Sequence, residues 1–324
     1  MPGQVANPNL AQCARLAEMR EEIKDKNASV KARLLNMSRE MKVDFDALLL
    51  RYFQERFLYR LMLSEFSNHF ILKGGFLLIC LNIPLSRPTK DIDFLVRGLK
   101  NSTPEFESIF KRIAEIVYDD GVHFDPASIY SERIIVDNDY KGIRIKIDAF
   151  LGKARNILQF DIGFGDSVWP KPNLIEFPTL LEEMKPWLKA YSKETIIAEK
   201  FEIMLKLEML NSRLKDFYDI YTLSLSCNFN GQVLKKSIEK TLLSRQTMVT
   251  ASPFVFREEF YHNPLKQLQW SAFLKKTRIT TVKKEFCDVM ERITDFLKPV
   301  LISIVNKTPM EKFWNAEKGF WEDI

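Results

Sequence analysis

The fold of this chain is decided by one short stretch in its first third, Arg87-Pro88-Thr89-Lys90-Asp91-Ile92-Asp93-Phe94-Leu95. Within it, Asp91 and Asp93 alternate with apolar residues, a pattern that predicts a β-strand. Side chains two residues apart on a strand share a face, so both carboxylates point the same way. Two neighbouring anions are unfavourable unless a proton or a cation joins them. Oxygen ligands suit Mg²⁺ or Mn²⁺, so the pair predicts a divalent metal site, with a solvated strand edge as the alternative.

A glycine pair precedes this stretch and a third acid follows it. Gly74 and Gly75 come after the apolar run Phe70-Ile71-Leu72. Because they lack a Cβ, they let the backbone approach a ligand such as a triphosphate. Asp161 lies in a second alternating segment, Leu158 to Phe164. Three carboxylates on strands are what two-metal phosphoryl or nucleotidyl transfer requires, so we expect this acid to join the pair as a third metal ligand.

A further alternating segment, Ile143 to Phe150, predicts the partner strand of Asp161. Residues 152–156 between the two segments predict a hairpin loop. Asp148 shares a face of this segment with Arg144, opposite the apolar side chains. Asp148 is therefore the next candidate for the metal site if Asp161 lies elsewhere.

Length and composition exclude several classes of protein. The chain has 324 residues and is 46% hydrophobic, enough for one large or two ordinary domains. Its net charge of +5 is compatible with phosphate-bearing partners. The cysteines lack CxxC spacing and the histidines lack a metal-ligand spacing, which argues against zinc. No serine-hydrolase or P-loop motif is present. Without a membrane span or a signal pattern, we expect a cytoplasmic protein with no membrane partner.

The hydrophobic pattern divides the chain into three regions. Residues 1–28 are interpreted as a leader. Residues 29–178 are interpreted as an α/β core with a helical lead-in, and residues 179–324 as a helical domain. The overall class is therefore α/β (α+β), with its strands gathered in the middle of the chain.

Two helix starts can be placed from capping residues. Asp44 or Asp46 is expected to cap a helix in the lead-in, and Ser192 is expected to cap a helix that runs to about Leu210. The charged residues of the first helix are expected mostly on the side opposite its apolar residues: Arg51, Glu55, Arg56 and Arg60.

Lys200 lies at the rim of the apolar stripe of the second of these helices. A lysine there is partly desolvated and must find an anion, either a nucleotide phosphate or an acid at the edge of the core. Asp216 and Asp219 are three residues apart and share a helical face. They are expected either to form surface ion pairs, to fix Lys200 or to contact a nucleotide.

Taken together, these phrases resemble the AbiEii/AbiGii nucleotidyltransferase toxin family, which is related to the MenT-type toxins. The phrases that carry the resemblance occur in the family's order: Leu72-Lys73-Gly74-Gly75, Arg87 to Phe94, Phe160 to Asp166, Ala198-Glu199-Lys200, and Arg213-x-Lys215-Asp216-x-x-Asp219. The segments Ala32 to Arg60 and Gln269 to Leu274 add to it, so the resemblance covers roughly residues 29–280. One departure is Gly74-Gly75, where nucleotidyltransferases often have Gly-Ser; backbone N–H groups must then contact the phosphate.

The resemblance implies a polymerase-β-like nucleotidyltransferase core, a helical C-terminal domain, and the toxin half of a toxin–antitoxin pair used in abortive infection. It implies transfer of a nucleoside monophosphate from an NTP to an acceptor, the 3′ end of tRNA in the related toxins, with Mg²⁺ or Mn²⁺ as cofactor. A cognate antitoxin is expected as a partner. The expected catalytic residues are Asp91, Asp93, Asp161 and Lys200, of which the three aspartates would bind metal. The expected nucleotide-binding residues are Gly74, Gly75, Arg87, Thr89, Lys90, Lys200 and Asp216.

Two other functions fit the same residues. The site could nucleotidylate or phosphorylate a protein partner, or the chain could be a non-catalytic regulator that only binds NTP. Intact acids at Asp91, Asp93 and Asp161 argue against a decayed site.

Overall fold

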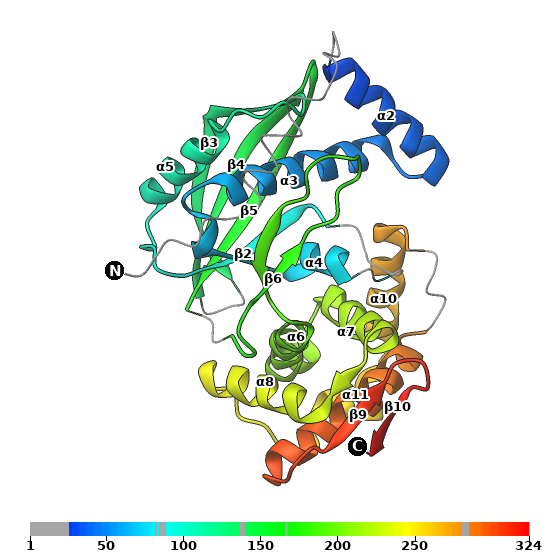
Figure 1. Cartoon of the computed structure of the whole chain (residues 1–324). Helices are drawn as coiled ribbons and strands as arrows, with labels where there is room; N and C mark the ends of the chain where they lie inside the picture. Colours follow the sequence, from blue (N-terminus) through cyan, green and yellow to red (C-terminus); the bar gives the residue numbers. More distant parts are fainter. Residues whose placement is uncertain are drawn as a thin grey trace.

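The computed structural model describes residues 26–81, 83, 89–136, 140–165, 168–279 and 285–323. A large sheet with helices on one side forms one part, and a group of helices lies against the end of that sheet (Figure 1). The mixture of helices and strands confirms the predicted α/β class. The expected leader falls mostly on residues 1–25, which lie outside the described residues.

The large sheet has seven strands in the order β3-β4-β5-β2-β1-β7-β6. The pairs β2–β5 and β1–β7 are parallel, and the other neighbours are antiparallel. The strands are β1 (Phe70–Lys73), β2 (Asp91–Val96), β3 (Val122–Val136), β4 (Tyr140–Leu151), β5 (Ala154–Phe164), β6 (Asn173–Glu176) and β7 (Trp187–Ala190). The predicted hairpin is confirmed, because β4 and β5 pair from Leu151 and Ala154 outward.

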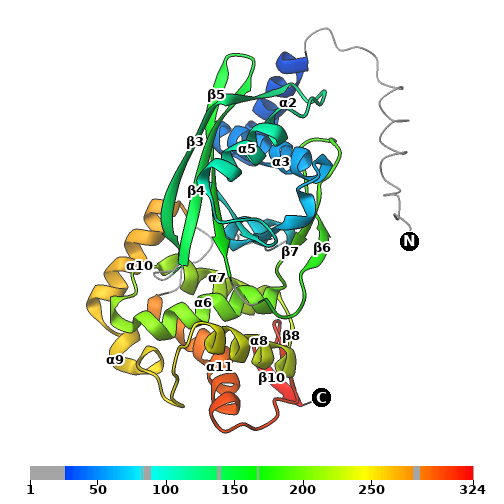
Figure 2. The same ribbon diagram turned by 90° about the vertical axis from the view of Figure 1, so that its left-hand side faces the viewer.

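One face of this sheet forms the core. Ile143, Ile145 and Ile147 of β4 are all fully buried, as their alternation predicts. Helices α2 (Lys26–Met41), α3 (Phe45–Leu63) and α5 (Thr103–Ala114) belong to this part, and Figure 2 shows α3 and α5 on one side of β3, β4 and β5. The ring of Phe57 on α3 lies 4.5 Å from that of Phe160 on β5 and 5.4 Å from that of Phe110 on α5. Since successive side chains alternate, the polar residues of the same strands lie on the opposite face.

The helical part begins at the predicted cap. Ser192 Oγ accepts a hydrogen bond from the Thr195 N–H at 3.2 Å, and α6 (Lys193–Leu207) follows. The remaining elements are η3 (Glu208–Leu210), α7 (Leu214–Ser226), β8 (Phe229–Asn230), α8 (Gly231–Ser244), η4 (Phe254–Phe256), α9 (Glu258–Tyr261), α10 (Pro264–Thr277), α11 (Phe286–Val305), β9 (Lys312–Asn315) and β10 (Phe320–Asp323). Strand β7 belongs to the large sheet although it lies beyond residue 178, where the sequence places the end of the core. The division into domains stays a prediction.

From Tyr52 to Leu61, helix α3 is buried on all sides, which the sequence did not indicate. Glu55 and Arg56 are fully buried, and the side that carries them packs against the segment between β6 and β7. Arg56 Nη2 donates to the Met184 carbonyl at 2.9 Å, and the Leu180 N–H donates to Glu55 Oε2 at 3.0 Å. Arg51 Nη2 donates in the same way to the Pro178 carbonyl at 2.7 Å. The charged side of α3 therefore satisfies the backbone of an irregular segment.

We expect Glu55→Gln to stabilise the protein at alkaline pH. Burial raises the pKa of Glu55 to about 7, although Arg56 and Arg51 oppose the shift. A carboxyl with a raised folded-state pKa adds stability below its unfolded value, near 4.5, and loses that contribution as the pH rises through 7. Glutamine keeps an acceptor for Leu180 without the buried charge. Urea unfolding at pH 8 should give a free energy about 1–3 kcal/mol above that of the parent, with the difference shrinking toward pH 5.

The exposed pair Glu176–Lys185 supplies the control for this prediction. Glu176→Gln should leave the free energy of unfolding nearly unchanged at both pH values. A Glu55→Gln variant less stable than the parent at pH 8 would show that the ion pairs with the arginines outweigh the cost of burial.

Candidate active site

The strand register brings five charged residues into one row across the sheet: Glu132 on β3 lies opposite Arg144, and the other four follow on β4, β5, β2 and β1. Asp93 on β2 lies directly opposite Asp161 on β5 and opposite Lys73 on β1. On the far side of β5, Asp161 lies opposite Arg144 of β4. Residues opposite one another on neighbouring strands share a face, so Arg144, Asp161, Asp93 and Lys73 form one line, here called the charged row. Two cations flank two anions in this line.

Asp91 lies beside the charged row on the same face of the sheet, two residues before Asp93 on β2. Its partner on β5 is Gln159, whose Nε2 donates to Asp91 Oδ1 at 2.9 Å. The prediction that Asp91 and Asp93 share a face is confirmed, because their partners Gln159 and Asp161 are also two residues apart on one strand. The structure thus brings Asp91, Asp93 and Asp161 together.

Gly74 has a specific structural reason to be glycine. Its φ is +71°, a conformation that L side chains rarely adopt, and a Cβ at this position would lie 2.0 Å from Asp93 Oδ2. The carboxylate of Asp93 therefore lies against the backbone of Gly74. Gly75 is buried in the following short helix, α4 (Gly74–Leu77), which continues into η2 (Leu78–Leu81).

The environment of Asp93 mixes burial with charges of both signs. Burial raises the pKa of Asp93 to about 6, and the carboxylates of Asp161 and Asp91 add to the shift. Lys215 and Lys73 oppose it. Lys215 lies in the first turn of α7, so the helical part of the chain places a cation beside this acid.

The carboxylate of Asp161 is already paired with a cationic side chain. Arg144 Nε donates to its Oδ1 at 2.8 Å and Arg144 Nη2 donates to its Oδ2 at 2.8 Å, a bidentate pair. Across the described ranges, no group of three or more acidic, histidine or cysteine side chains is arranged to hold a metal ion. Mg²⁺ is commonly held by one or two carboxylates together with substrate phosphates. Asp91 and Asp93 fit that pattern, whereas Asp161 has both oxygens engaged.

Lys200 pairs with acids in the helical part. Its Nζ lies 2.7 Å from Asp216 Oδ1 and 2.9 Å from Asp219 Oδ2, and both aspartates are fully buried. Arg213 Nε adds a contact to Asp216 at 2.8 Å. Burial would raise the pKa of Asp216, but Lys200 and Arg213 outweigh it and hold the value at about 2. This geometry matches the expectation that the two aspartates fix Lys200, and it joins α6 to α7.

A second link runs from the charged row to α6. Lys73 Nζ lies 3.5 Å from Glu199 Oε2, and the Tyr191 hydroxyl donates to Glu199 Oε1 at 2.9 Å. Lys73 is itself buried. The sheet and the helical part therefore share a chain of charged contacts at the site.

The loop before β2 is only partly described. Thr89 is partly buried and Lys90 is exposed, and the Lys90 carbonyl accepts a hydrogen bond from Gln54 Nε2 at 2.7 Å. Arg87, which the sequence predicts to bind nucleotide, lies outside the described residues.

The sequence reasoning missed Arg144, Lys73 and Lys215 as site residues. All three lie in segments whose patterns indicate a strand or the family resemblance and do not by themselves indicate a site residue. Arg144 alternates with buried isoleucines, and the two lysines belong to phrases of the family resemblance. The missing information was the strand register and the docking of α7, neither of which local patterning provides.

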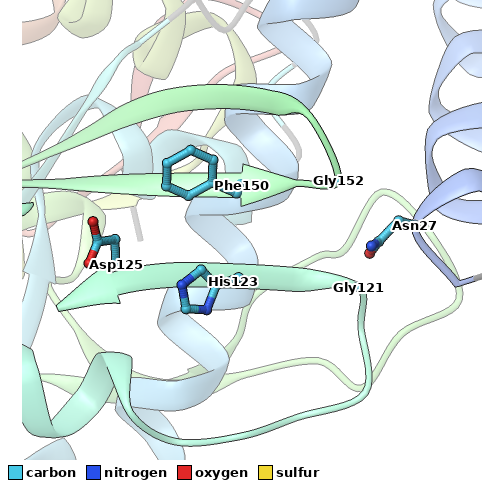
Figure 3. A pocket seen from close by; sticks show the side chains of 6 residues that line it. All are labelled: Asn27, Gly121, His123, Asp125, Phe150 and Gly152. Carbon is cyan, nitrogen blue, oxygen red and sulfur yellow. The ribbon is translucent and has the colours of Figure 1, made fainter.

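A hollow of about 570 Å³ lies elsewhere on the sheet (Figure 3). It is lined by Asn27, Gly121, His123, Asp125, Phe150 and Gly152. Phe150 is six residues along β4 from Arg144, or ~20 Å at the usual rise of a strand. None of the predicted site residues lines this hollow.

Comparisons with known proteins agree with the sequence resemblance. A protein-family model described as "Nucleotidyl transferase AbiEii toxin, Type IV TA system" matches residues 56–292. No curated protein matches the chain. In the described ranges, every helix is too short or too polar to cross a bilayer.

Two solved structures from Helicobacter pylori are similar at low identity. A candidate nucleotidyltransferase shares 14% identity at a TM-score of 0.47, over 82% of this chain and 98% of that one. The protein JHP933 shares 15% identity at a TM-score of 0.46, over 82% of this chain and 95% of that one.

The family match spans most of the chain, and the charged row, Gly74 and the Lys200–Asp216 pair all lie within it. The chain therefore belongs to the AbiEii family of nucleotidyltransferase toxins of type IV toxin–antitoxin systems.

Proposed function

We propose that this enzyme transfers a nucleoside monophosphate from an NTP to the 3′ end of tRNA, with Mg²⁺ or Mn²⁺ bound at Asp91 and Asp93. The observation that carries the proposal is the charged row, in which two acids on adjacent strands lie between cations from β1 and β4. The net charge of +5 suits a nucleic-acid acceptor. We also propose that the enzyme acts in the cytoplasm, where tRNA and NTP are available.

The two carboxylates supply the oxygen ligands for the metal. When bound there, the ion would neutralise charge on the phosphates and activate the acceptor hydroxyl. Asp93 is held in place by the backbone of Gly74, and Asp91 by Gln159. Asp161 keeps its predicted place beside this pair. Arg144 donates to both of its oxygens, so a metal that took Asp161 as a third ligand would share this carboxylate with the guanidinium.

The triphosphate is proposed to lie on the β1 side of the acids. Gly74 and Gly75 follow β1 directly and Gly74 lies against Asp93, while Lys73 of β1 and Lys215 of α7 both act on Asp93. Thr89 and Lys90 precede β2 in the chain and are proposed to add contacts to the triphosphate. Fixed cations around a reacting phosphate stabilise the charge that develops during transfer.

Lys200 and Asp216 also belong to the proposed nucleotide site. Their ion pair holds α6 against α7, and this packing presents Lys215 to Asp93. A direct contact between Lys200 and a phosphate would have to share its ammonium with Asp216 and Asp219.

Labelled nucleotides test the proposed reaction. The enzyme is incubated with total tRNA, Mg²⁺ and NTP labelled at the α- or the γ-phosphate. We expect the α-label in tRNA, the γ-label in released pyrophosphate but in neither tRNA nor protein, and no transfer in EDTA. Transfer of γ-label would indicate a kinase, and α-label in protein alone would indicate a protein acceptor. Either result would contradict the proposal.

We expect Asp93→Asn to abolish transfer without unfolding the protein. Asparagine keeps the shape but removes one charge from the metal site. Because the pKa of Asp93 is raised to about 6, the ionised carboxylate is unfavourable above that pH in the metal-free protein. The melting temperature at pH 8 should therefore be unchanged or higher, and Mn²⁺ binding followed by electron paramagnetic resonance should weaken.

The matched control is Asp148→Asn, which removes an acid from the same face of the sheet, where it pairs with Arg155 at 2.7 Å. Asp148 lies four residues along β4 from Arg144, or ~13 Å. This variant should keep near-parental activity and Mn²⁺ affinity. Equal losses in both variants, or full activity of Asp93→Asn, would contradict the assignment of the metal to Asp93.

We expect Lys200→Met to destabilise the protein strongly. Removal of this ammonium takes away the cation that pairs with two fully buried carboxylates, Asp216 and Asp219. Breaking a buried pair in this way costs about 3–5 kcal/mol, measurable by urea unfolding. The double variant Lys200→Met/Asp219→Asn should recover much of the loss. In that folded protein, a phosphate contact predicts an NTP KM raised by about tenfold or more, whereas an unchanged KM would assign Lys200 to folding alone.

A further inference from the structure

We propose that Arg144 binds a backbone phosphate of the acceptor strand, and that Asp161 is the positioning residue that aims it. The inference rests on the proposed function, because only a nucleic-acid acceptor carries such phosphates. It assigns Asp161 a role different from that of a metal ligand.

The hydrogen bonds of Arg144 leave donors for a further partner. The guanidinium has five N–H groups, and the bidentate pair uses one on Nε and one on Nη2. Three N–H groups can therefore donate elsewhere in the fixed plane that Asp161 imposes. The side chain of Arg144 is 30% exposed, whereas that of Asp161 is 16% exposed, so the cation faces outward from its anchor. A planar guanidinium held in this way suits a phosphate better than a flexible lysine does.

The position of Arg144 favours a contact with the acceptor over a contact with the NTP. Strand order places Arg144 on β4, two strands from Asp93 and three from Lys73. Neighbouring strands lie ~4.8 Å apart, so the backbones of Arg144 and Lys73 are separated by ~14 Å. Gly74, which follows β1, lies against Asp93 from the other flank, and Lys215 acts on Asp93 from α7. The triphosphate and Arg144 thus lie on opposite flanks of the acids.

In-line transfer of the nucleotide fits the same arrangement. The acceptor hydroxyl oxygen forms a bond to the α-phosphorus while the bond from that phosphorus to the bridging oxygen of the β-phosphate breaks. Pyrophosphate leaves with the bonding electrons, and the hydroxyl proton passes to water. Attacking and leaving oxygens are in line, on opposite sides of the phosphorus. With pyrophosphate leaving on the β1 side, the acceptor enters over β5 and β4, where Arg144 meets the phosphate that precedes the reacting end.

Steady-state kinetics of the full-length chain test this directly, with tRNA as the varied acceptor. Arg144→Met should raise the acceptor KM by about tenfold or more, the effect of losing a charge-assisted contact. Affinity for a non-hydrolysable NTP analogue with Mg²⁺, measured without acceptor, should change less than about twofold. The plot of log kcat/KM against log salt should also lose about 0.7 from its slope, the contribution of one phosphate contact to a single strand.

Asp161→Asn tests the positioning role. Arg144 keeps its charge, but its hydrogen bonds to residue 161 are weakened. The acceptor KM should therefore rise by less than in Arg144→Met, and the salt slope should stay at the parental value. The double variant Arg144→Met/Asp161→Asn should be no worse than Arg144→Met alone, because Asp161 acts through Arg144. The double variant removes both charges of the ion pair. It can therefore replace Arg144→Met in the kinetic test if that single variant fails to fold. Mn²⁺ affinity should be nearly parental in Asp161→Asn.

The control is Arg155→Met, which breaks another arginine–aspartate pair between β4 and β5, far from the acids. It should leave the acceptor KM and the salt slope unchanged. If the parent labels tRNA while Arg144→Met keeps the parental acceptor KM and salt slope, the role of Arg144 is wrong and the proposed function stands. A raised NTP dissociation constant in Arg144→Met, or Mn²⁺ affinity lost in Asp161→Asn, would likewise overturn it. A parent that labels no RNA would contradict the proposed function and this inference together.

Discussion

The parallel pairing of β2 with β5 is the constraint on which the rest of the site depends. It sets Asp93 directly opposite Asp161, two like charges on adjacent strands. Such a pair is stable only with compensation from nearby cations. Arg144 neutralises one acid through a bidentate contact, and Lys73 and Lys215 act on the other. Gly74 completes the arrangement, because any side chain there would collide with Asp93.

This compensation explains why the helical part belongs to the site. Lys215 comes from the first turn of α7, and Glu199 of α6 pairs with Lys73. The two helices are in turn fixed to each other by Lys200 between Asp216 and Asp219. The acids of the sheet are therefore linked to ion pairs of the helical part, which lies against the end of the sheet (Figure 1).

Local patterning predicted the parts of the fold that follow from one segment at a time. The alternation of Asp91 and Asp93, the hairpin before Asp161, and the cap at Ser192 were all visible in the sequence, and the structure has each of them. Strand β3 was not predicted, because a register shift between Asp125 and Tyr130 breaks its alternation.

Features that depend on tertiary contacts could not be predicted in this way. The burial of Glu55 and Arg56 arises because a distant segment covers the polar side of α3. The pairing of Arg144 with Asp161 follows from strand register and not from either segment alone. The three acids were expected to share a metal, and the sequence held no sign that an arginine already occupies the third.

A structure of the enzyme with Mg²⁺ and a non-hydrolysable NTP analogue tests the central claim most directly. We expect the metal against Asp91 and Asp93, the triphosphate beside Gly74, Lys73 and Lys215, and Arg144 still paired with Asp161. A metal ligated by Asp161 with Arg144 displaced, or a triphosphate lying over β4, would contradict this claim.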